Sequence, residues 1–343
     1  MPEVTIILAI YNVEKYLKKC LDSLLDQTFD NIKILAIDDG SPDNSLSILK
    51  TYSKNNDKIK YIKQDNGGYG SAIETALKHV KTKYFLICDP DDWLEKNCIE
   101  TLYKAAEENN ADMVVADMYY VYKNNATPRH RKCVHRSYDI VPYKKYNNVS
   151  SFAFFSPTPH AKLFKTELVK NIELPHHVNY TDTLLYLLCL NNCKSIYYIN
   201  KPLAYYYFDR PGNTAADIFG VTYSQKTFND QMTVINSSIR QLRSNKSEKY
   251  AIYYRIYVEI TSIITKLKFI DDGDYKENCL IIDKTLASIE EYSRELSVEI
   301  RDKKTIGVIA RKILVRLLLC RKTRMLCIKL LSNCHKINSK VLI

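Results

Sequence analysis

The chain has 343 residues, of which 46% are hydrophobic and 26% charged, a composition typical of a globular protein with ample core. The first residues lack the basic region of a signal peptide, and no uncharged apolar run approaches the ~20 residues of a membrane-spanning helix. The ten cysteines are scattered, so without an export signal we expect reduced thiols in a cytoplasmic protein.

The net charge of +11 is concentrated near the C-terminus. Residues 301–343 hold 12 Lys or Arg and one Asp, whereas residues 1–300 hold 38 basic and 38 acidic residues. The whole excess therefore lies in the last 43 residues. Such an asymmetry favours a polyanionic partner, either a membrane surface or a nucleic acid.

Hydrophobic periodicity predicts alternating strands and helices over the first 115 residues. The predicted strands are 4–9, 32–38, 59–63, 84–89 and one from 112, and the helices are 14–26, 45–52, 71–80 and 97–109. This alternation predicts a parallel α/β core with three layers. Farther along we predict a short helix at 162–169, a helix at 182–192, strands at 196–199 and 203–208, and helices from about 222.

The change of pattern predicts two domains, 1–220 and 221–343. The first would have a ligand-binding half, 1–118, and a second half, 119–220. The second domain would be helical, with the basic segment at its end.

Two short acidic clusters each follow a predicted buried strand. Asp38-Asp39-Gly40-Ser41 follows one strand, and Asp89-Pro90-Asp91-Asp92 follows another. In an open α/β sheet, ligands bind at the carboxyl ends of the strands. Five carboxylates at two such ends would repel one another unless a cation lay among them. The sequence therefore predicts a divalent metal ion that carries a diphosphate.

The acidic clusters and three further motifs resemble those of family 2 glycosyltransferases. The further motifs are Val4 to Asn12, Leu24 to Thr28, and Asn66-Gly67-Gly68-Tyr69-Gly70. The resemblance implies the GT-A nucleotide-sugar-binding fold, a mostly parallel sheet flanked by helices, here with a C-terminal helical extension. It also implies transfer of a sugar, from a UDP-sugar, to a saccharide or lipid-linked acceptor in cell-surface polysaccharide assembly.

The same resemblance implies which residues bind the nucleotide. Ala9 and Tyr11 end the first strand, where the Tyr11 ring would stack on the pyrimidine. Asp39 would accept a hydrogen bond from the imide N–H of uracil, which cytosine lacks. Gly67 would line the nucleotide, and Asp89 would bind the ribose or the waters of the metal ion.

Asp89 and Asp91 match the DxD motif, so the resemblance makes Asp91 the ligand of Mn²⁺ or Mg²⁺. Asp182 would be the catalytic base of an inverting reaction, although Thr181 stands where the family has another acid. The alternative is that Asp182 only stabilises the first turn of a helix. His160 would line the acceptor site, or else be a buried, hydrogen-bonded histidine.

The basic segment predicts an amphipathic helix at an anionic membrane surface, on the inner face of the plasma membrane. Its apolar stripe would comprise Ile306, Ile309, Ile313, Leu317, Cys320, Cys327 and Leu331. The alternative is a helix packed on the rest of the chain with a solvated basic face. Nucleic acid is not expected, because the segment has no Tyr or Phe among its charges.

Two rival functions remain open at this point. A nucleotidyltransferase-like enzyme would need a glycine-rich, basic phosphate loop after the first strand, but residues 9–13 contain neither glycine nor charge. The second rival is a non-catalytic module that binds membrane or nucleic acid and retains vestigial acidic sites.

Overall fold

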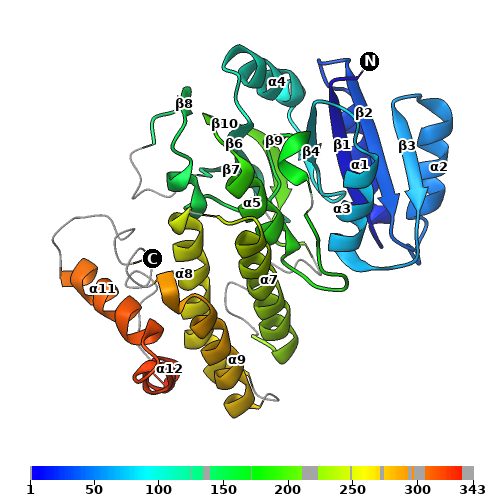
Figure 1. Cartoon of the computed structure of the whole chain (residues 1–343). Helices are drawn as coiled ribbons and strands as arrows, with labels where there is room; N and C mark the ends of the chain where they lie inside the picture. The colour runs from blue at the N-terminus through cyan, green and yellow to red at the C-terminus, as the bar shows by residue number, and fades with distance from the viewer. Residues whose placement is uncertain are drawn as a thin grey trace. The chain divides into compact units, whose positions relative to one another are not determined.

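The computed structural model describes residues 2–123, 125–133, 140–170, 172–210, 223–247, 249–270, 274–292, 296 and 306–333 (Figure 1). The chain divides into two compact units, Met1–Asn213 and Thr214–Ile343. The predicted domain boundary after residue 220 lies outside the described residues.

The first unit is a mixed α/β structure built on one large sheet. Its strands are β1 (Val4–Ile10), β2 (Ile32–Asp38), β3 (Ile59–Lys63), β4 (Tyr84–Ile87), β5 (Trp93–Leu94), β6 (Met113–Tyr122), β7 (Asn125–Arg131), β8 (Lys144–Tyr146), β9 (Lys162–Lys165) and β10 (Ile196–Tyr207). Its helices are α1 (Glu14–Leu25), α2 (Ser45–Asn55), α3 (Gly68–His79), α4 (Cys98–Glu108) and α5 (Thr181–Asn192), with 3₁₀ turns η1 (Ser150–Phe154) and η2 (Thr166–Val169).

The strand order is β3-β2-β1-β4-β9-β6-β10-β5, with β7 paired to β6 and β8 to β10. The predicted parallel arrangement is confirmed for β3-β2-β1-β4 and for β6 with β10. The additional strand β9, which the sequence did not predict, runs antiparallel to both β4 and β6. The predicted helix at 162–169 is therefore wrong over its first half, because pairing with two distant strands overrides local propensity.

Helices cover both faces of the sheet and bury the central strands completely. All seven residues of β1 are buried, as in other parallel sheets with covered faces. On one face, the side chains of Val4, Ile6, Leu8 and Ile10 join one core with Leu17, Leu21 and Leu24 of α1. Helix α4 packs on β6, β9 and β10, and α3 packs on β1 and β2.

The strands predicted at 196–199 and 203–208 form the single strand β10. Its pairing with β6 shifts register on both sides of Pro202. Proline has no N–H for the ladder, so it is accommodated at an irregularity rather than ending the strand. As a result, β10 extends as far as Tyr207, beside the acidic cluster that follows β4.

The second unit is helical over its described residues. It contains α7 (Gln225–Ser244), α8 (Tyr250–Lys266), α9 (Tyr275–Ser288), α11 (Ile306–Leu319) and α12 (Arg324–Asn333). Helix α12 packs against α8, α9 and α11. None of the helices in the described part of the chain is long and apolar enough to cross a membrane.

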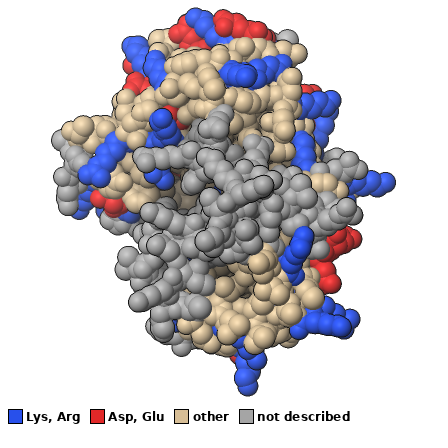
Figure 2. Space-filling view, turned by 90° about the vertical axis from the view of Figure 1, so that its left-hand side faces the viewer, with Lys and Arg blue, Asp and Glu red and all other residues tan. Residues whose placement is uncertain are grey.

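Basic side chains are not confined to the C-terminal helices. On the face that Figure 2 shows, Lys and Arg side chains stand at several separate places among uncharged residues. What distinguishes residues 301–343 is the near absence of acidic side chains, since Asp302 is the only one.

Candidate active site

The carboxyl ends of β1, β2 and β4 lie next to one another because these strands are parallel and in register. Ile10 of β1 pairs with Asp38, and Ile7 pairs with Ile87 of β4. Both acidic clusters therefore leave the sheet at the same edge, where open α/β sheets bind their ligands.

Asp39 is held by the glycine loop that opens α3. Its Oδ1 accepts hydrogen bonds from the Gly67 N–H (2.9 Å) and the Gln64 side-chain amide (2.7 Å). Its Oδ2 accepts one from the Gly68 N–H (2.8 Å). Gly68 has φ of +84°, and a Cβ there would lie 2.9 Å from the His177 nitrogen, so the position requires glycine. The structure thus joins two predicted nucleotide-binding residues, Asp39 and Gly67, through a backbone contact.

Two other predicted nucleotide-binding residues lie at the end of β1 or directly after it. Ala9 belongs to the buried strand, whereas Tyr11 follows it and is 48% exposed. An exposed ring at this edge of the sheet has a face available for a planar base. The stacking role of Tyr11 stays a prediction.

Asp38 is fully buried at the end of β2. Within the described part of the chain, neither of its carboxylate oxygens has a hydrogen-bond partner. Its main-chain carbonyl accepts a hydrogen bond from the Gln64 N–H (2.9 Å), so the turn is braced by backbone and not by this side chain. A carboxylate buried without a partner costs folding free energy, which marks this edge of the sheet as strained.

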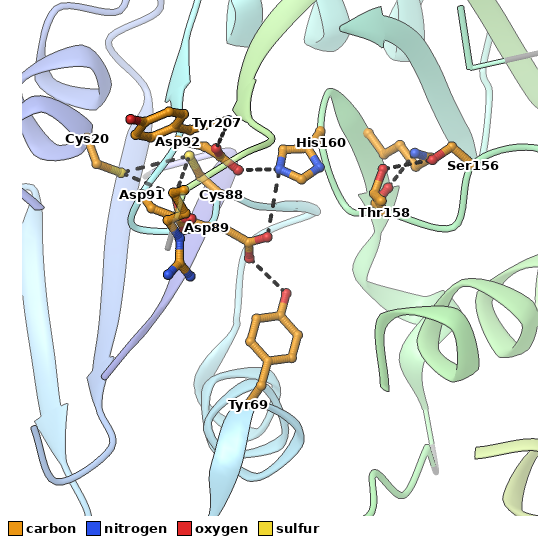
Figure 3. A network of polar contacts seen from close by, with 12 residues as sticks. Cys20, Tyr69, Cys88, Asp89, Asp91, Asp92, Ser156, Thr158, His160 and Tyr207 are labelled. Atoms are coloured by element: carbon orange, nitrogen blue, oxygen red, sulfur yellow. Dashed lines mark hydrogen bonds and ion pairs between the residues drawn. The ribbon is translucent and has the colours of Figure 1, made fainter. Parts of the chain in front are cut away.

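Asp89, Asp92 and His160 form a compact group of oxygen and nitrogen ligands (Figure 3). One atom from each lies within 4.8 Å of the others. His160 Nε2 contacts Asp92 Oδ2 and lies 3.7 Å from Asp89 Oδ2. From below, the Tyr69 hydroxyl donates a hydrogen bond to Asp89 Oδ1 (3.0 Å). The alternative interpretation of His160, a buried and hydrogen-bonded histidine, describes what the structure shows; contact with an acceptor stays a prediction.

Asp92 connects the acidic cluster to β10. Its Oδ1 accepts a hydrogen bond from the Tyr207 N–H (2.7 Å), and its Oδ2 contacts His160. Burial raises the pKa of Asp92 well above its ordinary value, and the neighbouring Asp91 adds to this rise. The Tyr207 N–H and Arg210 oppose it. Asp92 thus fixes the imidazole and the strand end in one arrangement.

Asp91, the predicted metal ligand, forms an ion pair with Arg210 through its Oδ2 and the arginine Nε. It is not one of the three clustered ligands, which are Asp89, Asp92 and His160. The side chain of Arg210 is largely buried and contacts the DxD motif.

The donor set fits a divalent cation. Two carboxylates and an imidazole within reach of one ion suit Mn²⁺, and the two carboxylates alone suit Mg²⁺, which prefers oxygen ligands. Burial raises the pKa of Asp89 to about 7, and repulsion by Asp92 and Asp91 adds to the rise while His160 opposes it. Burial also lowers the pKa of His160, which favours the neutral imidazole that binds metals. A cation at this point would relieve the crowding of carboxylates.

Asp182 lies in the first turn of α5, after Tyr180 at φ +65°. Its Oδ1 accepts a hydrogen bond from the Thr183 N–H (2.8 Å). Burial raises the pKa of Asp182, and the charges of His160 and Lys162 oppose the rise. The charge of Asp182 also acts on Tyr69, whose pKa is raised chiefly by burial and next by Asp89. The carboxylate therefore lies within the electrostatic field of the Asp89 group; its catalytic role stays a prediction.

Lys162, in β9, is a fully buried lysine beside this group. Its ammonium donates to the Thr158 carbonyl and lies 5.7 Å from the centre of the Tyr186 ring. Tyr186 is one helical turn after Asp182 on α5, so the lysine reaches the same face of that helix. Burial lowers the pKa of Lys162, and Asp182 is among the groups that oppose this.

The sequence did not single out Tyr69, Gln64 or Lys162 as site residues. Tyr69 stands inside a quoted motif, so its position was available as a signal even though its contact with Asp89 was not. Gln64 and Lys162 had no such signal. Their roles depend on partners 25 and 4 residues away along the chain and, for Lys162, on its contact with the Tyr186 ring of α5.

Comparison with known proteins identifies the family to which this chain is similar. Residues 5–173 match the model of glycosyl transferase family 2. The glycosyltransferase GlyA of Streptococcus pneumoniae is 31% identical over 293 residues, 80% of this chain and 40% of GlyA. An uncharacterised glycosyltransferase of Mycoplasma pneumoniae, the MG025 homologue, is 31% identical over 61% of this chain and 69% of its own length. The minor teichoic acid biosynthesis protein GgaB of Bacillus subtilis is 23% identical over 84% of this chain and 32% of GgaB.

This chain therefore spans less than half the length of GlyA and of GgaB. Among solved structures, S. aureus TarS 1–349 in complex with UDP-GlcNAc superposes with a TM-score of 0.57, at 18% identity, over 97% of this chain and 90% of that one. A mannosyltransferase from Pyrobaculum calidifontis, in complex with GDP-Man and Mn²⁺, gives a TM-score of 0.51 at 15% identity, over 96% and 87%. These likenesses confirm the GT-A fold that the sequence predicted, with additional C-terminal helices.

The order of the motifs, the sheet edge at which they meet and the match over residues 5–173 agree with one another. The chain belongs to glycosyl transferase family 2.

Proposed function

We propose that this glycosyltransferase uses a UDP-sugar and a divalent metal ion to glycosylate a saccharide or lipid-linked acceptor with inversion. The observation that carries the proposal is the placement of the Asp89, Asp92 and His160 group next to the Asp39 and Gly67 contact. If the group of Asp89, Asp92 and His160 held the diphosphate, the nucleobase would lie near Asp39 and Gly67. The complexes of TarS with UDP-GlcNAc and of the mannosyltransferase with Mn²⁺ support a nucleotide donor and a metal ion.

For the nucleotide, we assign the uracil to Tyr11, Ala9 and Asp39. The Tyr11 ring would stack on the base. Asp39 Oδ2 accepts a single protein hydrogen bond, so it retains a lone pair for the imide N–H. Because Asp39 is already fixed by Gly67, Gly68 and Gln64, it would lose little freedom on binding.

For the metal ion, we assign Asp89, Asp92 and His160 as the clustered ligands and retain Asp91 as a predicted ligand. When bound, Mn²⁺ or Mg²⁺ would neutralise charge on the departing diphosphate. Arg210, paired with Asp91, brings a fixed positive charge to the same place. Asp89 and Tyr69 would also lie against the ribose.

For the acceptor, we assign Asp182 as the base that takes the proton of the attacking hydroxyl. Its raised pKa brings its basicity closer to that needed for proton abstraction near neutral pH. Attack from the face opposite the diphosphate gives inversion. His160, whose ring packs against Tyr206, would border the acceptor.

Calorimetry with UDP, in the presence and absence of Mn²⁺, tests the proposal. We expect binding that strengthens with Mn²⁺ and that exceeds the binding of GDP and CDP. Equal binding of all three diphosphates would contradict the uracil assignment. A nucleotidyltransferase-like enzyme would instead release pyrophosphate from a nucleoside triphosphate, and a non-catalytic module would bind no nucleotide at all.

We further propose that residues 301–343 bind the anionic surface of the inner leaflet of the plasma membrane. Helices α11 and α12 expose Ile313, Leu317, Leu326 and Leu330, at 51%, 38%, 62% and 59%. Arg316, Lys322 and Lys329 are exposed beside them. Of the predicted stripe, Ile313, Leu317 and Cys320 are exposed, and the side chains of Ile306 and Ile309 lie outside the described residues. Apolar side chains ringed by cations favour a surface of anionic lipid.

A further inference from the structure

A row of aromatic rings runs outward from His160 along one face of β6 and β10. The ring centre of Tyr206 lies 4.5 Å from that of His160 and 5.4 Å from that of Tyr120, its register partner on β6. Phe208 stacks on Tyr120 at 4.8 Å, and Tyr122 lies 5.6 Å from Phe208. Tyr206 is buried at the inner end of the row, whereas Tyr120, Phe208 and Tyr122 are partly exposed. The row is therefore continuous with the candidate active site.

Two exposed arginines border the outer part of this row. They belong to β7, which pairs antiparallel with β6. The guanidinium of Arg131 lies 5.7 Å from the centre of the Tyr120 ring, and that of Arg129 lies 5.4 Å from the Tyr122 ring. Within the described part of the chain, neither arginine forms an ion pair with an Asp or Glu, although Arg131 shares a side-chain hydrogen bond with Tyr120. A guanidinium has five N–H donors, so both arginines retain donors for an external anion.

Rings and arginines in this arrangement suit a particular kind of ligand. The apolar C–H face of a sugar ring packs on a partly exposed aromatic ring, and a guanidinium binds phosphate or carboxylate with two parallel hydrogen bonds. Aromatic rings with arginines also bind single-stranded nucleic acid. The start of the row at His160, next to the group that would hold the donor diphosphate, favours a saccharide.

We propose that Tyr120, Tyr122 and Phe208, together with Arg129 and Arg131, form an acceptor subsite for a saccharide that carries phosphate or carboxylate groups. We call these five residues the ring–arginine surface. The proposal rests on the glycosyltransferase function above and deepens it, because it names the chemical class of the acceptor. Sugar units distant from the reacting hydroxyl would bind here.

The opposite face of the same strands offers an internal control. There the rings of Trp93, Tyr205, Tyr119 and His130 follow one another with centres 5.1, 4.9 and 6.3 Å apart. The Tyr205 hydroxyl donates to Glu95 (2.6 Å), and His130 Nε2 lies 2.8 Å from Asp117 Oδ2. The polar groups of this second row bind protein carboxylates, so we expect no role for it in saccharide binding.

The test measures binding of dextran oligosaccharides to the full chain by calorimetry. Three probes share one backbone: neutral dextran, phosphorylated dextran and carboxymethyl dextran. We expect both anionic forms to bind more tightly than the neutral form. The double variant Arg129→Gln/Arg131→Gln should lose affinity for the anionic forms by about tenfold or more, and leave the neutral form unchanged. Tyr122→Ala/Phe208→Ala should weaken all three.

Two matched controls isolate this surface. Lys50→Gln/Lys54→Gln removes the same charge from exposed residues of α2, and Tyr119→Ala removes a ring from the opposite face of β6. Both controls should bind the probes as wild type does. The inference is overturned if anionic dextrans bind no better than neutral dextran, if either control loses as much affinity, or if a single-stranded oligonucleotide binds more tightly than every dextran.

UDP binding, measured on the same samples, separates this inference from the proposed function. All variants should retain the UDP affinity of wild type, because none of the replaced residues belongs to the Asp39 and Gly67 contact or to the Asp89, Asp92 and His160 group. A wild-type chain that binds UDP but makes no distinction among the dextrans overturns the subsite alone. A wild-type chain that does not bind UDP overturns the proposed donor.

Discussion

Arg210 is paired with Asp91, so the carboxylate predicted to bind the metal ion already contacts a cation. The pair joins the loop after β4 to the residue three positions beyond the end of β10. Arginine stays charged at all ordinary pH values, so this cation is permanent. The acidic edge of the sheet is thus partly neutralised by the protein itself, and a divalent ion would complete the neutralisation.

Replacement of Asp91 by Ala should remove most of the Mn²⁺ dependence of UDP binding. Without the carboxylate, Arg210 loses this ion pair and can attract the diphosphate directly, so some metal-independent binding should remain. Titration calorimetry at several Mn²⁺ concentrations measures this. Asp30→Ala, which removes an exposed carboxylate two residues before β2 begins, is the control. An unchanged Mn²⁺ response in Asp91→Ala would show that Asp89, Asp92 and His160 bind the metal ion without Asp91.

Asp182→Asn should lower turnover by about a hundredfold or more while UDP affinity stays near that of wild type. The amide has nearly the shape of the carboxylate and can still accept the Thr183 N–H bond, so α5 should be preserved. Initial rates of UDP release in the presence of acceptor measure the effect. Near-normal turnover would mean that Asp182 only stabilises the first turn of α5.

Lys162→Met should move the acidic limb of the kcat profile to higher pH. The Lys162 cation favours the ionised form of Asp182 and so opposes the rise that burial causes in its pKa. Removing the cation lets the pKa of Asp182 rise further, and a base is lost at a higher pH as the solution is acidified. Rates measured between pH 4 and pH 9 locate the limb. A limb that moves to lower pH, or does not move, would exclude this electrostatic link.

Leu326→Asp/Leu330→Asp should abolish binding to vesicles that contain anionic lipid. These are the most exposed apolar side chains of α12, and each aspartate adds a charge that the lipid surface repels. Co-sedimentation with anionic and with neutral vesicles measures the loss. Leu280→Asp, which alters an exposed leucine on α9, should leave binding intact. Release of the wild type by salt should be incomplete, because apolar contacts are not screened.

Arg324→Met should lower the free energy of unfolding by about 2–3 kcal/mol. Arg324 is buried, and its guanidinium pairs with Glu290 and donates to the Leu318 carbonyl (2.9 Å) and the Leu319 carbonyl (3.2 Å). The partly exposed position of Glu290 keeps the loss below that of a fully buried pair. Denaturant unfolding measures the change. Arg321→Met, at an exposed position in the same segment, should change stability by less than about 0.5 kcal/mol.

The sequence predicted those strands and helices that have a clear local signal, either a continuous apolar run or an amphipathic period. β2 and β3 were predicted to the residue, and β1 and α1 to within one, because buried strands and amphipathic helices have distinct periods. β9 was missed because residues 162–165 become a strand only by pairing with β4 and β6. The glycine loop was predicted to precede α3, but it forms the first turn of that helix.

The residues of the candidate site likewise divide into those that the sequence could predict and those that it could not. Asp39 and Asp89 could be found from short motifs that follow strands, and the structure brings each into a hydrogen-bonded group. The Asp91 and Arg210 pair could not, because it joins residues 119 positions apart. Lys162 was hidden for another reason. Lysine is normally exposed, and its burial against Tyr186 of α5 depends on a strand that was predicted as a helix.

Two glycines of the loop lock α3 to a segment more than a hundred residues later. A Cβ on Gly70 would lie 2.5 Å from the Pro175 carbonyl oxygen, and one on Gly68 would lie 2.9 Å from the His177 nitrogen. The His177 N–H also donates to the Gly67 carbonyl (2.7 Å). Evolution and protein engineering therefore cannot change these two stretches separately. In relatives that keep this packing, we expect the two glycines to persist while surrounding loop residues diverge, and transplanting the loop alone into another scaffold should fail.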